Sequence, residues 1–196
     1  MSISILMKIL IIGDSFAADW AVKYPDLQGW PNLLSKKYDV TNLAQAGVSE
    51  YKIYKQLCSV NVIDYDLAIV AHTSPYRLVT RKHPIHSDDI LHGNCDLIYS
   101  DIEHHNLKSK NKSNLSLQTA YWFFAYHYDE EYQETAYKLF REKIEYLLTI
   151  PTITITDFDD WSDIIDRYRG KCNHLSDAGN NIIYERIVSK IGKLVI

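Results

Sequence analysis

Three residues that can take part in acyl transfer stand far apart in the chain: Ser15, Gly47 and His174. A serine hydroxyl attacks a carbonyl carbon only after a base removes its proton, and histidine does this near neutral pH. A loop glycine can offer its N–H to the oxyanion that forms, because no side chain blocks the approach. These residue types therefore predict nucleophilic catalysis at a carbonyl group.

The element expected to position Ser15 is the apolar run of residues 8–12, which is rich in isoleucine. Such a run is typical of a strand that is buried on both faces. It ends at Gly13-Asp14-Ser15, and a helical pattern begins at Phe16. We therefore expect Ser15 at the amino end of a helix, where unpaired N–H groups and the helix dipole favour negative charge. A plain helix cap is the alternative role for this serine.

The rest of the chain alternates between strand-like and helix-like segments. Further strands are predicted at 38–43, 65–71 and 151–156, and helices at 16–37 with interruptions, 49–57, 113–148 with a break near 128–131, and 176–193. This alternation predicts an α/β domain, with a parallel sheet covered by helices on both faces. We expect one domain over residues 1–196.

Loops that follow the strands of a parallel sheet lie at one edge, where such folds place their sites. Ser15, Gly47 and His174, which precedes the last helix, are therefore expected to meet there. A polar, histidine-rich excursion at about 76–112 is expected to be irregular and to cover this edge. Residues 157–169 are predicted to form an acidic loop with at most a helical turn.

Three segments resemble the sequence blocks of the SGNH, or GDSL-type, hydrolases, in the order of that family. They are Gly13-Asp14-Ser15, Asn42-Leu-Ala-Gln-Ala-Gly47 and His174-Leu-Ser-Asp-Ala-Gly179. The resemblance implies a three-layer α/β/α fold with a flavodoxin-like parallel sheet of four to five strands, and ester hydrolysis without a cofactor. It also implies that Ser15 is the nucleophile, that His174 is the general base, and that the N–H groups of Ser15 and Gly47 line an oxyanion hole.

The chain departs from the family pattern at two places. The family's Gly-x-Asn block is replaced by His72-Thr73-Ser74, so that the hydroxyl of Ser74 (or Thr73), or the His72 imidazole, would have to replace the asparagine amide. Losing one oxyanion donor typically costs on the order of 3 kcal/mol of transition-state stabilisation.

The second departure concerns the acid that normally precedes the histidine, since Lys171 occupies that position. Either Ser15 and His174 act as a dyad, with a backbone carbonyl holding the ring, or another carboxylate orients it. The candidates for that acid are Asp157, Asp159 and Asp160, followed by Asp163, Asp166 and Asp177.

Composition argues against several other functions. A net charge of -4 gives no basic field for nucleic acid, and the longest apolar run is too short to span a membrane and lacks a signal-peptide cleavage site. The start at Met1 or Met7 stays open.

Three cysteines without a CxxC pair predict no disulfide framework or zinc knuckle, and a cytoplasmic protein is expected. The histidines of the excursion and the following helix are expected to be solvated rather than to bind a metal, because neither HxxxH nor HExxH spacing occurs. These histidines are His83, His86, His92, His104, His105 and His127.

The leading functional hypothesis is a serine esterase or acyl hydrolase that acts on a small-molecule or glycan ester, with an O-acetylated carbohydrate as one concrete substrate. The alternative is a carbohydrate-binding or interaction module that keeps the fold and has lost part of the catalytic machinery. A phosphate-binding flavodoxin-like domain ranks last, because the turn at Gly13-Asp14-Ser15 lacks the glycines of a phosphate loop.

Overall fold

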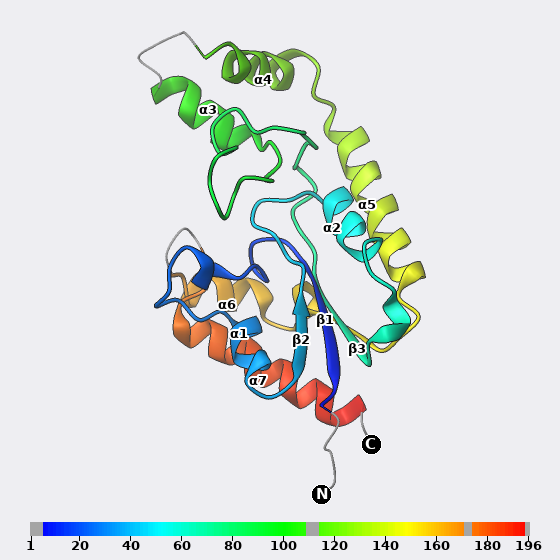
Figure 1. Cartoon of the computed structure of the whole chain (residues 1–196). Coiled ribbons are helices and arrows are strands. Elements are labelled where there is room, and N and C mark those ends of the chain that lie inside the picture. The colour runs from blue at the N-terminus through cyan, green and yellow to red at the C-terminus, as the bar shows by residue number, and fades with distance from the viewer. Residues whose placement is uncertain (1–5, 109–113, 171–173, 195–196) are drawn as a thin grey trace, which may run out of the picture.

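The computed structural model describes residues 6–108, 114–170 and 174–194, and its centre is a four-stranded parallel sheet (Figure 1). The strands are β1 (Lys8–Gly13), β2 (Asp39–Asn42), β3 (Leu67–Ala71) and β4 (Thr152–Thr154), in the order β2-β1-β3-β4. This order matches the first four strands of the flavodoxin-like arrangement. The prediction of a parallel sheet is confirmed.

Helices cover both faces of the sheet, so the predicted three-layer α/β/α architecture is confirmed as well (Figure 1). One layer contains α1 (Trp30–Ser35), α6 (Trp161–Arg167) and α7 (Asp177–Leu194), and the other contains α2 (Glu50–Leu57) and α5 (Glu130–Leu147). Short 3-10 turns lie at Trp20–Val22, Val62–Asp64 and Ile155–Asp157. Among the described residues, no helix is long and apolar enough to cross a membrane.

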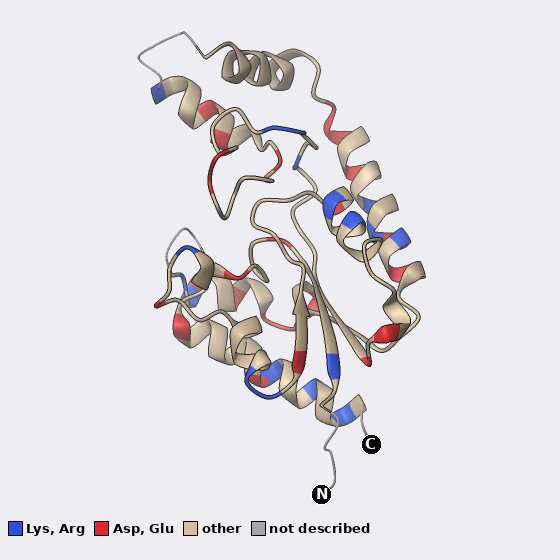
Figure 2. Ribbon diagram, in the orientation of Figure 1, with Lys and Arg blue, Asp and Glu red and all other residues tan. Residues whose placement is uncertain are grey.

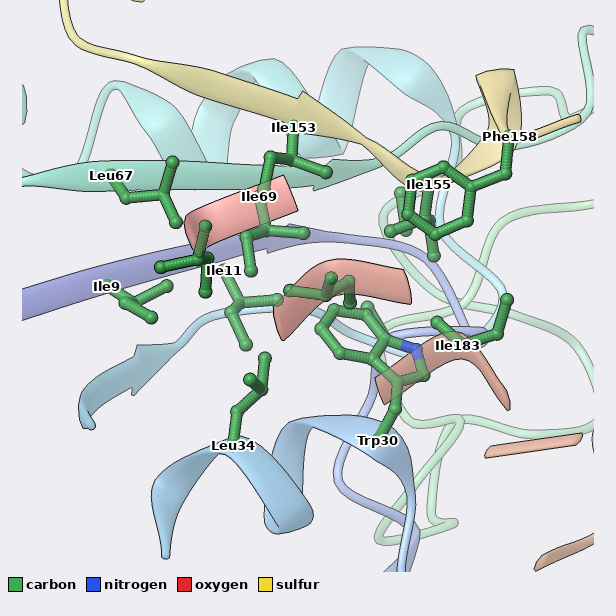
Figure 3. Packing of buried hydrophobic residues seen from close by; sticks show 14 of the residues in the cluster. Ile9, Ile11, Trp30, Leu34, Leu67, Ile69, Ile153, Ile155, Phe158 and Ile183 are labelled. Carbon is green, nitrogen blue, oxygen red and sulfur yellow. The ribbon is translucent and has the colours of Figure 1, made fainter. Parts of the chain in front are cut away.

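Alternating residues of β1 point to opposite layers, and this fixes the register of the sheet. Ile9 and Ile11 pack against Trp30 and Leu34 of α1 (Figure 3), whereas Leu10 and Ile12 belong to the cluster beneath α2 and α5. Each of these strand side chains is fully buried. Burying one such side chain stabilises the fold by about 1.5–3 kcal/mol, so a slip by one residue would lose several of these terms.

A helical hairpin of α3 (Tyr99–Lys108) and α4 (Leu115–Tyr126) lies beyond the sheet, at the top of Figure 1. It has its own core, made with the loop before it, and the buried members are Leu97, Ile102, Leu117, Ala120 and Phe124. No charged residue occurs in α4, which is tan throughout in Figure 2. The expected irregular excursion therefore ends in a helix.

The prediction of a helix from Phe16 is wrong, because residues 14–18 form a turn. The Asp14 carboxylate accepts a hydrogen bond from the N–H of Phe16 at 3.0 Å, and Asp19 accepts one from Ala21 at 3.0 Å. Aspartates that bond to nearby N–H groups in this way offer the backbone an alternative to a helix. Ser15 therefore follows β1 directly and does not begin a helix.

Two other segments differ from the sequence prediction. Residues 161–167, expected as loop, form α6, whose Ile164 is buried in the core beneath it. The last strand is shorter than predicted, since β4 ends at Thr154 and a 3-10 turn follows. In α6 a single isoleucine is buried, which is too little periodicity to predict a helix from the sequence.

Candidate active site

Ser15 and His174 line the same pocket, at the carboxyl end of β1. The pocket encloses a cavity of about 30 Å³, and Ser15 itself is 5% exposed. The other lining residues come from the turn after β1, the start of α1 and the start of α7: Phe16, Ala18, Trp20, Leu27, Gln28, Gly29, Leu175, Asp177 and Asn180. The fold thus brings two segments that are far apart in the sequence to one small cavity.

Trp20 contacts both of these residues. Its indole N–H donates to the carbonyl oxygen of Ser15 at 2.7 Å, and its ring centroid lies 4.3 Å from that of His174. Phe16 packs on the same imidazole with a centroid separation of 5.1 Å. Two aromatic rings therefore pack against the His174 side chain.

The backbone before α7 is fixed by its own hydrogen bonds. The His174 carbonyl accepts a hydrogen bond from Gly170, and the side chain of Asn180 accepts one from the N–H of Trp30 at 3.0 Å. The hydroxyl of Ser176 accepts from Gly179 at 3.4 Å, in agreement with its predicted place at the start of the last helix. These contacts join α7 to α1 directly beside the pocket.

Asp14, next to the candidate nucleophile, is a buried carboxyl group. Burial raises the pKa of Asp14 to about 6, although the Phe16 N–H, the nearby Arg77 and a hydrogen bond with Thr73 favour the ionised form. A carboxyl group with such a pKa exchanges a proton close to neutral pH. The sequence places Asp14 only in a turn after a strand and gives no sign of its burial or of its raised pKa.

Gly47 is held in a backbone conformation that favours glycine, with φ of +75°. Its carbonyl accepts hydrogen bonds from Arg77 at 3.1 Å and from the N–H of Asp96 at 2.8 Å, and a Cβ at this position would lie 2.6 Å from Cβ of Cys95. Gly47 is not among the residues that line the Ser15 pocket. The backbone conformation and the contact with Cys95 therefore require glycine at this position, independently of any role of its N–H in an oxyanion hole.

The segment His72-Thr73-Ser74, which follows β3 and replaces the family's Gly-x-Asn block, contains a buried hydrogen-bond network and no asparagine amide. Nδ1 of His72 lies 2.6 Å from the carboxylate of Glu50, which also accepts from the N–H of Thr73 at 3.3 Å. The Thr73 hydroxyl accepts from Arg77 at 3.1 Å. Ser74 is exposed and lines a different pocket, next to α5.

The three preferred candidates for an orienting acid lie at the surface and do not line the Ser15 pocket. Asp157 accepts two hydrogen bonds from Arg141, both at 2.9 Å, while Arg186 bonds to the Asp159 carbonyl and to the Asp160 carboxylate. Among the described residues that line the Ser15 pocket, Asp177 is the one with a carboxylate side chain. Lys171 lies outside the described residues.

The expectation that the histidines of the excursion are solvated is wrong for His83, whose side chain is 1% exposed. Burial and the neighbouring His86 lower the pKa of His83 to about 4. The rings of His83 and His86 are stacked with centroids 4.7 Å apart. The sequence spacing does not predict the burial of His83, because its neighbours His86 and Asp101 come from a loop and from α3.

In comparisons with known proteins, no family model and no curated protein matches this sequence.

Proposed function

We propose that the chain is a serine esterase of SGNH type that hydrolyses small esters through an acyl-enzyme on Ser15. The observation that carries this proposal is the common pocket of Ser15 and His174 at the carboxyl edge of a parallel sheet. The resemblance of Gly13-Asp14-Ser15, Asn42–Gly47 and His174–Gly179 to the SGNH blocks supports it independently of the geometry.

In the proposed reaction, Nε2 of His174 takes the proton of Ser15 Oγ while Oγ bonds to the ester carbonyl carbon. The tetrahedral intermediate then expels the alcohol, which receives the proton from His174. Water, activated by the same imidazole, hydrolyses the acyl-enzyme and restores the serine. The protein needs no cofactor for these steps.

The size of the pocket favours a short acyl group. A cavity of about 30 Å³ suits an acetyl group better than a long acyl chain. An O-acetylated small molecule or glycan therefore fits the proposal, with the alcohol part outside the cavity. Backbone N–H groups of Ser15 and Gly47 remain the proposed oxyanion donors. The Thr73 hydroxyl accepts a hydrogen bond from Arg77 and Ser74 lines a different pocket, so neither of the two hydroxyls proposed as third donor lines the Ser15 pocket.

Trp20 and Phe16 pack against the His174 ring and limit its orientations. This packing favours the Ser15–His174 dyad over a triad with Asp157, Asp159 or Asp160, each of which contacts an arginine elsewhere. Asp177, which lines the pocket, is the alternative acid. An acid mainly sets the tautomer and orientation of the imidazole, so a packed ring can still act as base.

The test is hydrolysis of p-nitrophenyl acetate by the wild type, Ser15→Ala, His174→Ala and a matched control, Ser49→Ala. Ser49 is also a buried serine, and its hydroxyl has no hydrogen-bond partner among the described residues. Ser15→Ala and His174→Ala should each lower kcat at least about a thousandfold, and Ser49→Ala should leave it unchanged. A fluorophosphonate probe should label the wild type and not Ser15→Ala. Full activity of Ser15→Ala would overturn the proposal.

A second candidate function is a carbohydrate-binding or interaction module without turnover. Two of the proposed oxyanion-hole residues, Gly47 and Thr73, do not line the Ser15 pocket. Both accept hydrogen bonds from Arg77 instead, and this favours the second candidate. This candidate predicts binding of an acetylated glycan that Trp20→Ala abolishes, with no probe labelling and no hydrolysis.

The free thiols of Cys58 and Cys95 support a cytoplasmic location as part of the proposal.

A further inference from the structure

Three histidines from the excursion and α3 converge on the carboxylate of Asp101. Nε2 of His86 lies 3.1 Å from Oδ2, Nε2 of His83 lies 3.5 Å from the same oxygen, and Nε2 of His105 lies 3.5 Å from Oδ1. His83 and His86 belong to the loop before α3, while Asp101 and His105 are one turn apart on α3. The cluster therefore joins the loop that carries His83 and His86 to helix α3.

The ligand atoms of His83, His86 and Asp101 all lie within 4.8 Å of one another. A tetrahedral zinc site, with bonds of about 2.0–2.2 Å, separates its ligand atoms by roughly 3.3 Å, so the three side chains must move closer together to close the site. Imidazole nitrogens with one carboxylate oxygen are a ligand set that suits zinc and related divalent ions.

We propose that His83, His86 and Asp101 bind one divalent transition-metal ion of the zinc class. His86 and Asp101 are 30% and 29% exposed, so an ion has a route to the site from solvent. Nε2 of His105 lies 3.5 Å from the other oxygen of Asp101 and is close enough to supply a fourth ligand by rotation. The proposal does not depend on esterase activity.

The protonation of His83 in the metal-free protein follows from its neighbours. Its Nδ1 accepts hydrogen bonds from the N–H groups of Ile85 and His86, both at 3.2 Å, so the hydrogen of the neutral ring is on Nε2. When a metal binds Nε2, that proton leaves and Nδ1 takes one up, which keeps the ring neutral. The two turn hydrogen bonds must then open, so metal binding changes the backbone at residues 83–86.

The same loop reaches the candidate active site. The ring of His92 lies 5.8 Å from that of His86 and 5.9 Å from that of Trp20, and Asp89 forms an ion pair with Lys23. An ion that holds the loop to α3 would therefore also restrict the segment that packs on Trp20. The role assigned to the metal is structural, at a distance from the reacting groups.

The experiment uses full-length protein without a histidine tag, stripped of metal by a chelator. Zn²⁺ is titrated in competition with a chromophoric chelator, and Co²⁺ is added separately to record the visible ligand-field spectrum. We expect one ion per chain, a Co²⁺ spectrum typical of four or five ligands, and a higher Tm with Zn²⁺.

His86→Ala and Asp101→Asn should each weaken Zn²⁺ binding at least about tenfold and remove the Tm increase. The matched control is His104→Ala, an exposed histidine on α3 that does not bond to Asp101, and it should bind as the wild type does. Far-UV circular dichroism checks that all variants fold. Absence of stoichiometric binding, or equal binding by wild type and His86→Ala, would overturn the proposal, and a hydrogen-bonded cluster without an ion would replace it.

Discussion

The indole nitrogen of Trp20 lies 2.7 Å from the backbone oxygen of Ser15, and this hydrogen bond joins the 3-10 turn at Trp20–Val22 to the end of β1. Because the same ring packs on His174, one side chain sets the positions of both candidate catalytic residues. The turn after β1 is not helical, so the geometry at Ser15 depends on such side-chain contacts rather than on a helix axis.

Trp20→Phe tests this dependence. The variant keeps an aromatic ring against His174 but leaves the buried carbonyl of Ser15 without its donor, which should lower the free energy of unfolding by about 1 kcal/mol. Urea unfolding monitored by circular dichroism measures the loss. Val22→Ala, in the same turn but 55% exposed, should change it by less than about 0.5 kcal/mol. Equal effects of the two substitutions would show that the hydrogen bond adds nothing.

Gly47→Ala should destabilise the protein by about 2 kcal/mol or more. A Cβ at this residue meets Cys95 at 2.6 Å, and a φ of +75° is unfavourable for alanine. The matched control is Gly192→Ala in α7, where a Cβ meets nothing within 4 Å. That substitution should be neutral or stabilising by up to about 1 kcal/mol, because alanine is the better helix former. Thermal unfolding of both variants checks the contrast.

Asp14→Asn should change how stability depends on pH. The pKa of Asp14 is raised to about 6 in the folded protein, whereas the unfolded chain ionises near 3.8. Between these values the unfolded state loses its proton first, so the stability that the protonated carboxyl contributes below pH 4 is lost as pH rises through 6. The variant stays neutral and should avoid this loss.

The expected difference between Asp14→Asn and wild type grows by about 3 kcal/mol from pH 4 to pH 7, in favour of the variant. Urea unfolding of both proteins at several pH values measures it. The difference isolates Asp14, because the other titrating groups are common to both proteins. Parallel pH profiles would contradict the prediction.

Glu50→Ala should cost about 2–4 kcal/mol. It removes the acceptor for two buried donors, Nδ1–H of His72 and the N–H of Thr73. Glu103→Ala is the control, since the Glu103 carboxylate accepts a hydrogen bond from Tyr99 at the surface and should contribute less than about 0.5 kcal/mol. A loss for Glu50→Ala as small as that for Glu103→Ala would mean that water reaches the His72 pair.

The centre of the sheet could be predicted from the sequence because β1 and β3 are nearly unbroken apolar runs. Ile9, Leu10, Ile11 and Ile12 are all buried, and this pattern has few alternatives in a chain with alternating helices. The meeting of Ser15 and His174 in one pocket also follows from topology, since both segments lie at the same edge of a parallel sheet.

The rest of the site depends on contacts between residues distant in sequence, which spacing does not encode. The raised pKa of Asp14 comes from its burial in the folded protein, and the convergence of histidines on Asp101 comes from the packing of α3 against its preceding loop. The turn at residues 14–18 differs from the predicted helix for a local reason. Its apolar residues have helical spacing, but the aspartates at both ends bond to the backbone instead.

The separate core of the α3–α4 hairpin has a consequence for how the protein opens. The hairpin buries Ile102, Leu117 and Phe124 in a cluster that shares no member with those of the sheet, so it can unfold while β1 and β3 stay paired. Amide hydrogen exchange should therefore divide the chain into two cooperative units, with faster exchange in α4 than in β1.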